Sequence, residues 1–183
     1  MDVEALAKTK IGRVFIRWMG VIMESRLRYR LFGPLKILQG AGIQPGMKVL
    51  EIGCGTGFFT VPAGRLLERH GSLIAMDILP DSVEAVSKKV QEEGLSNVQV
   101  IHGDALDTKL EQESLDEILI FGVIPAPVLP LKKLLPEMHR ILKPGGAIAV
   151  WPPSWVHRSI DGSRWFQYVG KQDGVQLYRR ADL

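Results

Sequence analysis

From residue 48 onward, short apolar runs alternate with longer amphipathic segments. The runs are rich in Val, Ile and Leu, and the segments between them repeat their apolar positions with the period of a helix. Strands of this kind, separated by helices, are typical of a parallel sheet covered on both faces. The pattern predicts strands at Lys48–Ile52, Leu73–Met76, Val98–Ile101, Leu115–Phe121 and Ala147–Trp151. It predicts helices at Phe58–His70, Asp81–Glu93 and Leu131–Leu142, and a further one around Asp107–Glu113.

The end of the chain departs from this alternation. Arg164–Val169 and Val175–Arg179 have the pattern of strands, and Asp173-Gly174 lies between them. Asp-Gly between two strand-like runs is a strong hairpin signal. Neither an internal repeat nor a linker interrupts residues 47–183. We therefore expect one compact α/β domain there, with a mostly parallel seven-stranded sheet, helices on both faces and a C-terminal antiparallel hairpin.

The first 46 residues form a separate region. Between Ile11 and Phe32, apolar residues recur at helical spacing, and arginines occupy the opposite side. Gly33-Pro34 ends this amphipathic pattern, and a short helix at Leu35–Gln39 is expected to follow. We interpret residues 1–46 as a helical lid segment. Two alternatives stay open: peripheral contact with a membrane surface through this helix, and ordinary packing against the domain.

Composition narrows the classes of protein to consider. The chain has 183 residues, 46% of them hydrophobic, so it can bury a substantial core. A single cysteine, Cys54, excludes a disulfide framework and a multi-cysteine zinc site, so we expect no metal and a cytoplasmic location. The net charge is +3, but residues 1–48 hold nine Lys and Arg against three Asp and Glu. Because the basic residues gather there and no recognition module is apparent, the signal for nucleic-acid binding is weak.

The most informative stretch begins at the first expected strand. Val49–Ile52 leads into glycines at alternate positions, Gly53, Gly55 and Gly57, and a helix begins behind them. Glycine allows the backbone to turn sharply and to lie close to a ligand. Phe58 occupies the position where a dinucleotide-binding loop requires glycine, and the phosphate-binding loop motif is also absent. The ligand at this loop therefore need not carry a pyrophosphate.

Four motifs in order carry a family resemblance. Glu51–Gly57 resembles motif I of the class I S-adenosylmethionine (SAM)-dependent methyltransferases, and Ala75-Met76-Asp77 resembles the second motif. Gly103-Asp104-Ala105 resembles the third, and Leu142–Gly146 resembles the turn before the fifth strand. The resemblance covers roughly residues 35–151 and is closest to the ubiquinone/menaquinone-biosynthesis group. It implies a Rossmann-like fold, SAM as cofactor and S-adenosylhomocysteine as product.

The resemblance and the spacing together nominate the cofactor-binding residues. Asp77 lies about 20 residues beyond the glycine loop, where an acid can accept hydrogen bonds from ribose hydroxyls; capping the next helix is its alternative role. Asp104 would accept from the adenine amino group or serve as a loop acid. Glu51 would reach the methionine ammonium group or act as a buried structural acid. The expected set is Glu51, Gly53, Cys54, Gly55, Thr56, Gly57, Asp77, Ile78, Gly103, Asp104, Ala105 and Phe121.

The methyl acceptor is less well defined. Methyl transfer from a sulfonium depends mainly on alignment, so a general base is needed only for some acceptors. The segment Ile120–Pro127 lacks the motifs of DNA methyltransferases, which favours a small-molecule or lipid-like acceptor. His157, after the fifth strand, is the candidate base, although a histidine in a short loop is often merely solvated.

Two other functions remain open from the sequence. One is a SAM-binding protein without transferase activity. The other is an RNA or protein methyltransferase that uses the basic N-terminal helix. The sequence gives no indication of the oligomeric state.

Overall fold

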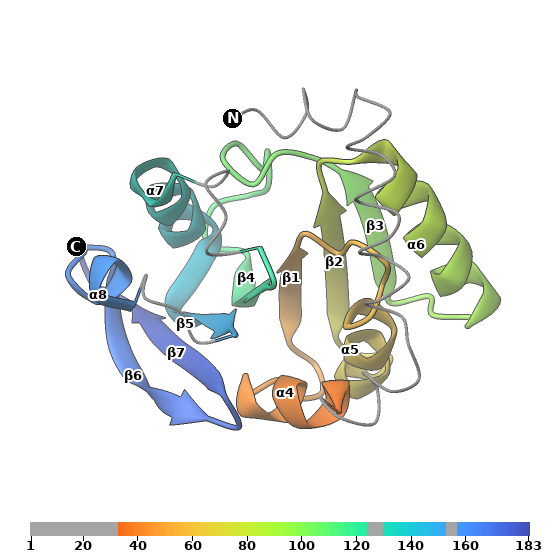
Figure 1. Cartoon of the computed structure of the whole chain (residues 1–183), viewed down its shortest axis with the longest axis horizontal. Coiled ribbons are helices and arrows are strands. Elements are labelled where there is room, and N and C mark those ends of the chain that lie inside the picture. Colours follow the sequence, from red (N-terminus) through yellow and green to blue (C-terminus); the bar gives the residue numbers. More distant parts are fainter. Residues whose placement is uncertain (1–32, 124–129, 153–156) are drawn as a thin grey trace.

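The computed structural model describes residues 33–123, 130–152 and 157–183 (Figure 1). The expected helix Ile11–Phe32 lies outside the described residues. The helices are α4 (Pro34–Gly40), α5 (Thr60–Leu67), α6 (Pro80–Glu92), α7 (Leu131–Ile141) and α8 (His157–Asp161). The strands are β1 (Lys48–Ile52), β2 (Ser72–Asp77), β3 (Val98–His102), β4 (Leu115–Phe121), β5 (Leu142–Trp151), β6 (Phe166–Gln172) and β7 (Val175–Arg180).

The strands form one sheet in the order β3-β2-β1-β4-β5-β7-β6. The first five strands are parallel, and β7 joins β5 in the antiparallel sense and pairs with β6. The two residues of the hairpin turn, Asp173 and Gly174, have φ values of 47° and 83°, as the Asp-Gly signal requires. The predicted α/β fold, with a Rossmann-like, mostly parallel sheet and a C-terminal hairpin, is therefore confirmed.

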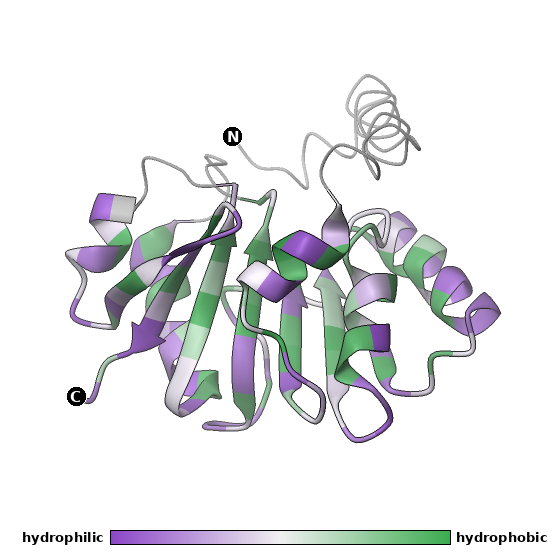
Figure 2. Cartoon of the chain, turned by 90° about the horizontal axis from the view of Figure 1, so that it is seen from below, coloured by the Kyte–Doolittle hydropathy of each residue, from purple (hydrophilic) through white to green (hydrophobic). Residues whose placement is uncertain are grey.

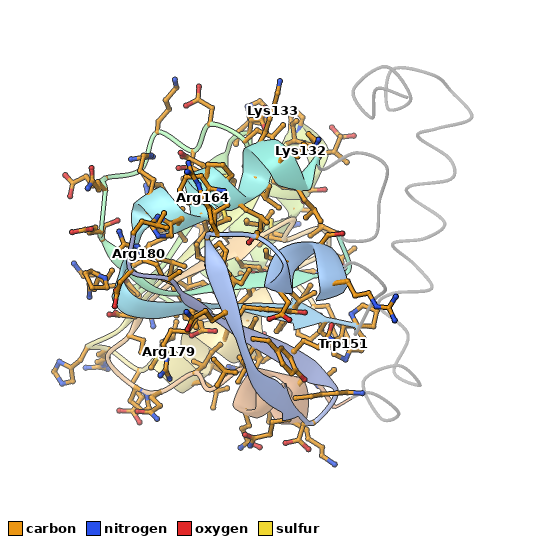
Figure 3. The ribbon with its side chains drawn as sticks, turned by 90° about the vertical axis from the view of Figure 1, so that its left-hand side faces the viewer. Lys132, Lys133, Trp151, Arg164, Arg179 and Arg180 are labelled. Atoms are coloured by element: carbon orange, nitrogen blue, oxygen red, sulfur yellow. The ribbon has the colours of Figure 1, made fainter. Side chains whose placement is uncertain are left out.

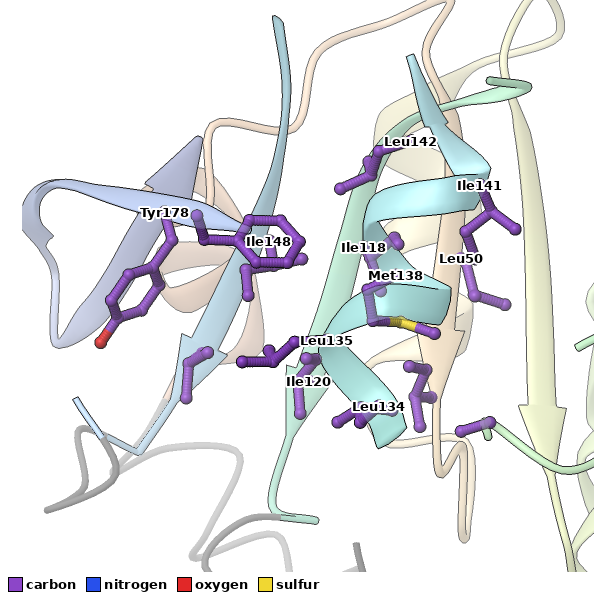
Figure 4. Packing of buried hydrophobic residues seen from close by; sticks show 14 of the residues in the cluster. Leu50, Ile118, Ile120, Leu134, Leu135, Met138, Ile141, Leu142, Ile148 and Tyr178 are labelled. Carbon is purple, nitrogen blue, oxygen red and sulfur yellow. The ribbon is translucent and has the colours of Figure 1, made fainter. Parts of the chain in front are cut away.

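Helices cover both faces of the sheet because each presents one apolar stripe. On one face, α4 and α5 pack against β1, β4 and β5, and α6 packs beside them on β2 and β3. On the other face, Leu134, Leu135, Met138 and Ile141 of α7 bury their side chains against β4 and β5 (Figure 4). The central strands are mostly apolar and the helices are apolar on one side only, as Figure 2 shows. None of the described helices is both long and apolar enough to span a bilayer.

The helix predicted around Asp107–Glu113 is wrong. This segment forms no helix, and Lys109 and Glu113 have φ values of 59° and 53°, outside the right-handed helical region. Its one apolar side chain, Leu110, packs against the core, and Glu137 of α7 accepts hydrogen bonds from the amide and the hydroxyl of Thr108 at 3.0 and 2.6 Å. Contacts with a helix distant in sequence thus replace local helical hydrogen bonds.

The other differences concern boundaries. The strand predicted from Ala147 begins at Leu142, directly after α7 ends at Ile141, with a register shift opposite Leu115–Glu117. The helix predicted to start at Phe58 begins at Thr60. The short helix α8 was not predicted at all.

Candidate functional site

The glycine loop lies at the point where the strand order reverses, between β1 and β4. In open α/β sheets, ligands bind at such a point, beyond the carboxyl ends of the strands. The amides of Gly53 and Cys54 both donate to the Met76 carbonyl oxygen, at 2.8 and 3.1 Å, which ties the loop to β2. Gly53, Gly55 and Gly57 have φ values of 73°, 54° and 80°, so the alternating glycines are conformationally required.

Gly53 also has no space for a side chain. A Cβ added there would lie 2.3 Å from Cγ1 of Val123, which follows the end of β4. The loops after β1 and β4 therefore meet at this glycine. The predicted ligand loop is thus closed on one side by the start of the β4 loop.

Asp77 joins the loop to the end of β2. One carboxylate oxygen accepts from the Gly55 amide at 2.8 Å, and the other accepts from the Leu79 amide at 2.9 Å. Leu79 precedes the first residue of α6, so Asp77 does not cap that helix, and the alternative role considered for it is not observed. Burial raises the pKa of Asp77, although the amide hydrogen bonds partly offset this effect.

Glu51 is buried at the end of β1, with 2% of its surface exposed. The Thr60 hydroxyl donates to its carboxylate at 2.6 Å, which links β1 to the first turn of α5. Burial raises the pKa of Glu51 to about 8, with a further increase from the charge of Asp77. Glu51 therefore has a structural role, which was the alternative to binding the methionine ammonium group.

The third motif lies beside Asp77. The Gly103 amide donates to the Asp77 carbonyl oxygen at 3.0 Å, and Asp104 is exposed. The Asp104 side chain accepts from the Leu106 amide at 2.8 Å, while Ala105 is buried in the core. Ile78 is 39% exposed, and its carbonyl oxygen lies 3.0 Å from Nε2 of His102. The structure thus brings Asp77, Ile78 and residues 103–105 together at one edge of the sheet.

Two of the nominated residues, Cys54 and Phe121, are buried in the core. Cys54 is buried, and burial together with the negative charges of Glu51 and Asp77 raises the pKa of its thiol. The thiol is therefore unsuited to nucleophilic chemistry. Phe121 packs edge-on against Phe59 in the core, with ring centroids 4.9 Å apart.

The acceptor side is only partly described. His157 begins α8, but its side chain lies outside the described part of the structure, as do residues 124–129 and 153–156. Across the described ranges, no group of three or more His, Cys, Asp or Glu side chains could hold a metal ion.

Sequence reasoning missed Lys89. Its ammonium group donates to the Thr56 carbonyl oxygen at 2.8 Å, from the last turn of α6 to the glycine loop. The available signal was helical phase, because Lys89 follows the buried Val86 by three residues and so faces the same side.

These residues fit SAM. The loop offers backbone without Cβ atoms, and the Thr56 hydroxyl within it is buried without a hydrogen-bond partner among the described residues. A buried carboxylate, Asp77, stands beside the loop with lone pairs beyond those used by its two amide donors. Hydroxyl and amino groups of a nucleoside are suitable partners for such a carboxylate.

Comparisons with known proteins agree with this geometry. Residues 43–167 match the family described as methyltransferase domain. Demethylmenaquinone methyltransferase of Staphylococcus aureus strain MRSA252 is 32% identical over 116 residues, which make up 62% of this chain and 46% of that protein. The chain thus spans about half the length of the curated relatives it matches.

Solved structures share the fold. A SAM-dependent methyltransferase from Aquifex aeolicus matches with a TM-score of 0.75 and 23% identity, over 88% of this chain and 96% of that one. A putative S-adenosyl-L-methionine-dependent methyltransferase from Methanococcus maripaludis matches with a TM-score of 0.67 and 17% identity, over 92% and 93%. Given the family match over more than half of its length, together with the four motifs, this chain belongs to the class I SAM-dependent methyltransferases.

Proposed function

We propose that the protein transfers the methyl group of SAM to a small-molecule or lipid-like acceptor. The observation that carries this proposal is the buried Asp77 carboxylate, hydrogen-bonded to the Gly55 amide at 2.8 Å where the sheet order reverses. A carboxylate held in this way is positioned before the ligand arrives. Positioning matters here because the reaction is an in-line displacement whose rate depends on alignment.

Four of the nominated residues have a proposed part in holding the cofactor through their side chains. Asp77 accepts from the ribose hydroxyls, Asp104 accepts from the adenine amino group, and Glu51 faces the methionine ammonium group. Ile78 offers exposed apolar surface to the adenine ring. When bound, SAM supplies a methyl group on a positively charged sulfur that leaves readily. The protein then needs only to orient the donor, exclude water and admit the acceptor.

The remaining proposals depend on parts of the chain outside the described residues, namely the predicted helix Ile11–Phe32 of the N-terminal segment and the side chain of His157. Residues 1–46 act as a lid over the cofactor, and His157 acts as a base where the acceptor carries a proton of high pKa. If this segment is a lid, SAM should slow proteolysis near Arg17, Arg26 or Arg28. Protection by anionic vesicles, with no effect of SAM, would replace the lid by a membrane anchor. We also propose a cytoplasmic location, since the lone Cys54 is a buried free thiol.

Two observations support a small or lipid-like acceptor. The curated relatives at 31–32% identity are described as demethylmenaquinone methyltransferases. The stretch 120–127 is apolar and rich in proline, without the motifs of base methylation. Binding of SAM without transfer is the rival function.

Transfer of a labelled methyl group tests the proposal. Purified protein would be incubated with methyl-labelled SAM and either the lipid fraction or the aqueous small-molecule fraction of a cell extract. We expect labelled product in one of these fractions and formation of S-adenosylhomocysteine, with both lost in Asp77→Ala. If the wild-type protein binds SAM but neither fraction yields labelled product, the small-molecule or lipid-like acceptor is wrong, and SAM binding without transfer and RNA or protein methylation are the functions left to test.

A further inference from the structure

Two opposite charges from one β–α unit hold the glycine loop. Asp77 at the end of β2 accepts from the Gly55 amide, and Lys89 on the following helix donates to the Thr56 carbonyl oxygen, each at 2.8 Å. The two bonds act on neighbouring residues of the loop. Asp77 is part of the family motif, whereas Lys89 lies outside all four motifs.

The Lys89 contact completes the restraint on one peptide unit. The Thr56 carbonyl accepts from Lys89, and the Gly57 amide of the same peptide unit donates to the Cys54 carbonyl oxygen at 2.8 Å. Both polar groups of this peptide are thereby fixed. Val86, one turn earlier on α6, is fully buried and packs against Gly57, whose added Cβ would lie 3.4 Å from its Cγ2.

The neighbouring lysine provides a contrast. The Lys88 side chain is 77% exposed and pairs only loosely with Glu92, at 3.8 Å within the helix. Lys89 instead reaches a backbone carbonyl 33 positions earlier in the chain, through a part-buried hydrogen bond. A hydrogen bond from a charged donor is stronger than a neutral one, so it can restrict a loop that its glycines leave conformationally free. Gly55 and Gly57, which flank Thr56, are both in the left-handed region.

We propose that Lys89 is a positioning residue for the cofactor loop. Its ammonium group holds the Thr56–Gly57 peptide in the orientation that binds SAM before SAM arrives. Preorganisation of this kind raises affinity by removing the cost of ordering the loop on binding. The inference rests on the proposed function only in naming SAM as the ligand.

The test compares Lys89→Met with Lys88→Met, two changes that remove the same charge from the same helix. For Lys89→Met we expect the Kd values for SAM and for S-adenosylhomocysteine to rise together by about tenfold. Without cofactor, hydrogen exchange at the Gly57 amide should be faster by a similar factor, while the melting temperature changes little. Lys88→Met should leave both quantities within about twofold of wild type, and Lys89→Arg should restore most of the affinity.

Three outcomes would overturn the role of Lys89. They are unchanged cofactor affinity in Lys89→Met, unchanged exchange at Gly57, and an equal effect of Lys88→Met. Failure of the proposed function would give a different result, because the wild-type protein itself would then not bind SAM. The exchange measurement would still test the Lys89 contact in that case.

Discussion

Among the described residues, three carboxyl groups are buried: Glu51, Asp77 and Glu117. Glu51 and Asp77 receive hydrogen bonds within the site. Glu117, on β4, is 6% exposed, and its Oε1 has no hydrogen-bond partner in the described part of the chain. Burial, together with the charge of the adjacent Asp116, raises the pKa of Glu117 well above 4.5. At this position an acid costs stability and has no visible compensation.

This cost should depend on pH. The folded state keeps the Glu117 proton while the unfolded state releases it near pH 4.5, so the free energy of unfolding falls as pH rises above that value. Glu117→Gln removes the titration. We expect the variant to be more stable than wild type by about 1–3 kcal/mol at pH 8 and nearly equal to it at pH 4.5.

Denaturant unfolding of both proteins at several pH values measures the difference. Glu111→Gln, at an exposed position, is the matched control and should show no such trend. A constant difference between Glu117→Gln and wild type across this range would refute ionisation as the cause.

At the scale of elements, the loop after β1 was predictable and the segment after β3 was not. The glycine spacing and the strand before it are local features, and the positive φ values follow from them. Leu106 and Leu110 are four residues apart, as in a helix, but they pack into the core from an irregular segment. The contact that fixes this segment comes from Glu137 on α7, 29 residues away from Thr108. Likewise, Lys88 and Lys89 are neighbours of the same type, and only their helical phase relative to Val86 indicates which of them faces the glycine loop.

The close approach of the β1 and β4 loops gives a prediction at this scale. Gly53→Ala places a Cβ 2.3 Å from Cγ1 of Val123 at a φ of 73°. Gly46→Ala has a similar φ of 88° but meets no atom within 4 Å. In both variants, the left-handed backbone conformation should lower the free energy of unfolding by about 1–2 kcal/mol. Gly53→Ala should lose clearly more stability than Gly46→Ala, because Val123 must also move.

The second-site variant Val123→Ala removes the obstructing methyl groups. It should recover the additional loss in Gly53→Ala and leave Gly46→Ala unchanged, as thermal unfolding would show. Equal costs at the two glycines would mean that the β4 loop does not close on Gly53.

Acidic and basic residues are unevenly distributed between the two halves of the described chain. Residues 33–123 contain seven Lys and Arg against thirteen Asp and Glu, whereas residues 130–183 contain nine against four. The second part supplies α7, α8 and the β6–β7 hairpin. Figure 3 shows Lys132 and Lys133 of α7 together with Arg164, Arg179 and Arg180 on the side formed by these elements. A nearly neutral domain therefore presents one basic side, in addition to the basic N-terminal segment.

This division predicts oriented binding to anionic surfaces. The double variant Lys133→Glu/Arg179→Glu should elute from a cation exchanger at clearly lower salt than Arg69→Glu/Lys88→Glu, which changes the net charge equally but on α6 and just after α5. All four positions are exposed, so folding should be unaffected. Equal elution of the two variants would show that net charge alone governs binding.

The central claim is that this chain binds SAM at the loop after β1, with Asp77 as the main anchor. Isothermal calorimetry of the wild-type protein with SAM and S-adenosylhomocysteine tests it most directly. We expect saturable binding of both, weakened by roughly 2–3 kcal/mol in Asp77→Ala, because charge-assisted hydrogen bonds are lost. The exposed Asp81→Ala should bind like wild type. Absence of binding by well-folded wild-type protein, or equal affinity in Asp77→Ala, would contradict the account.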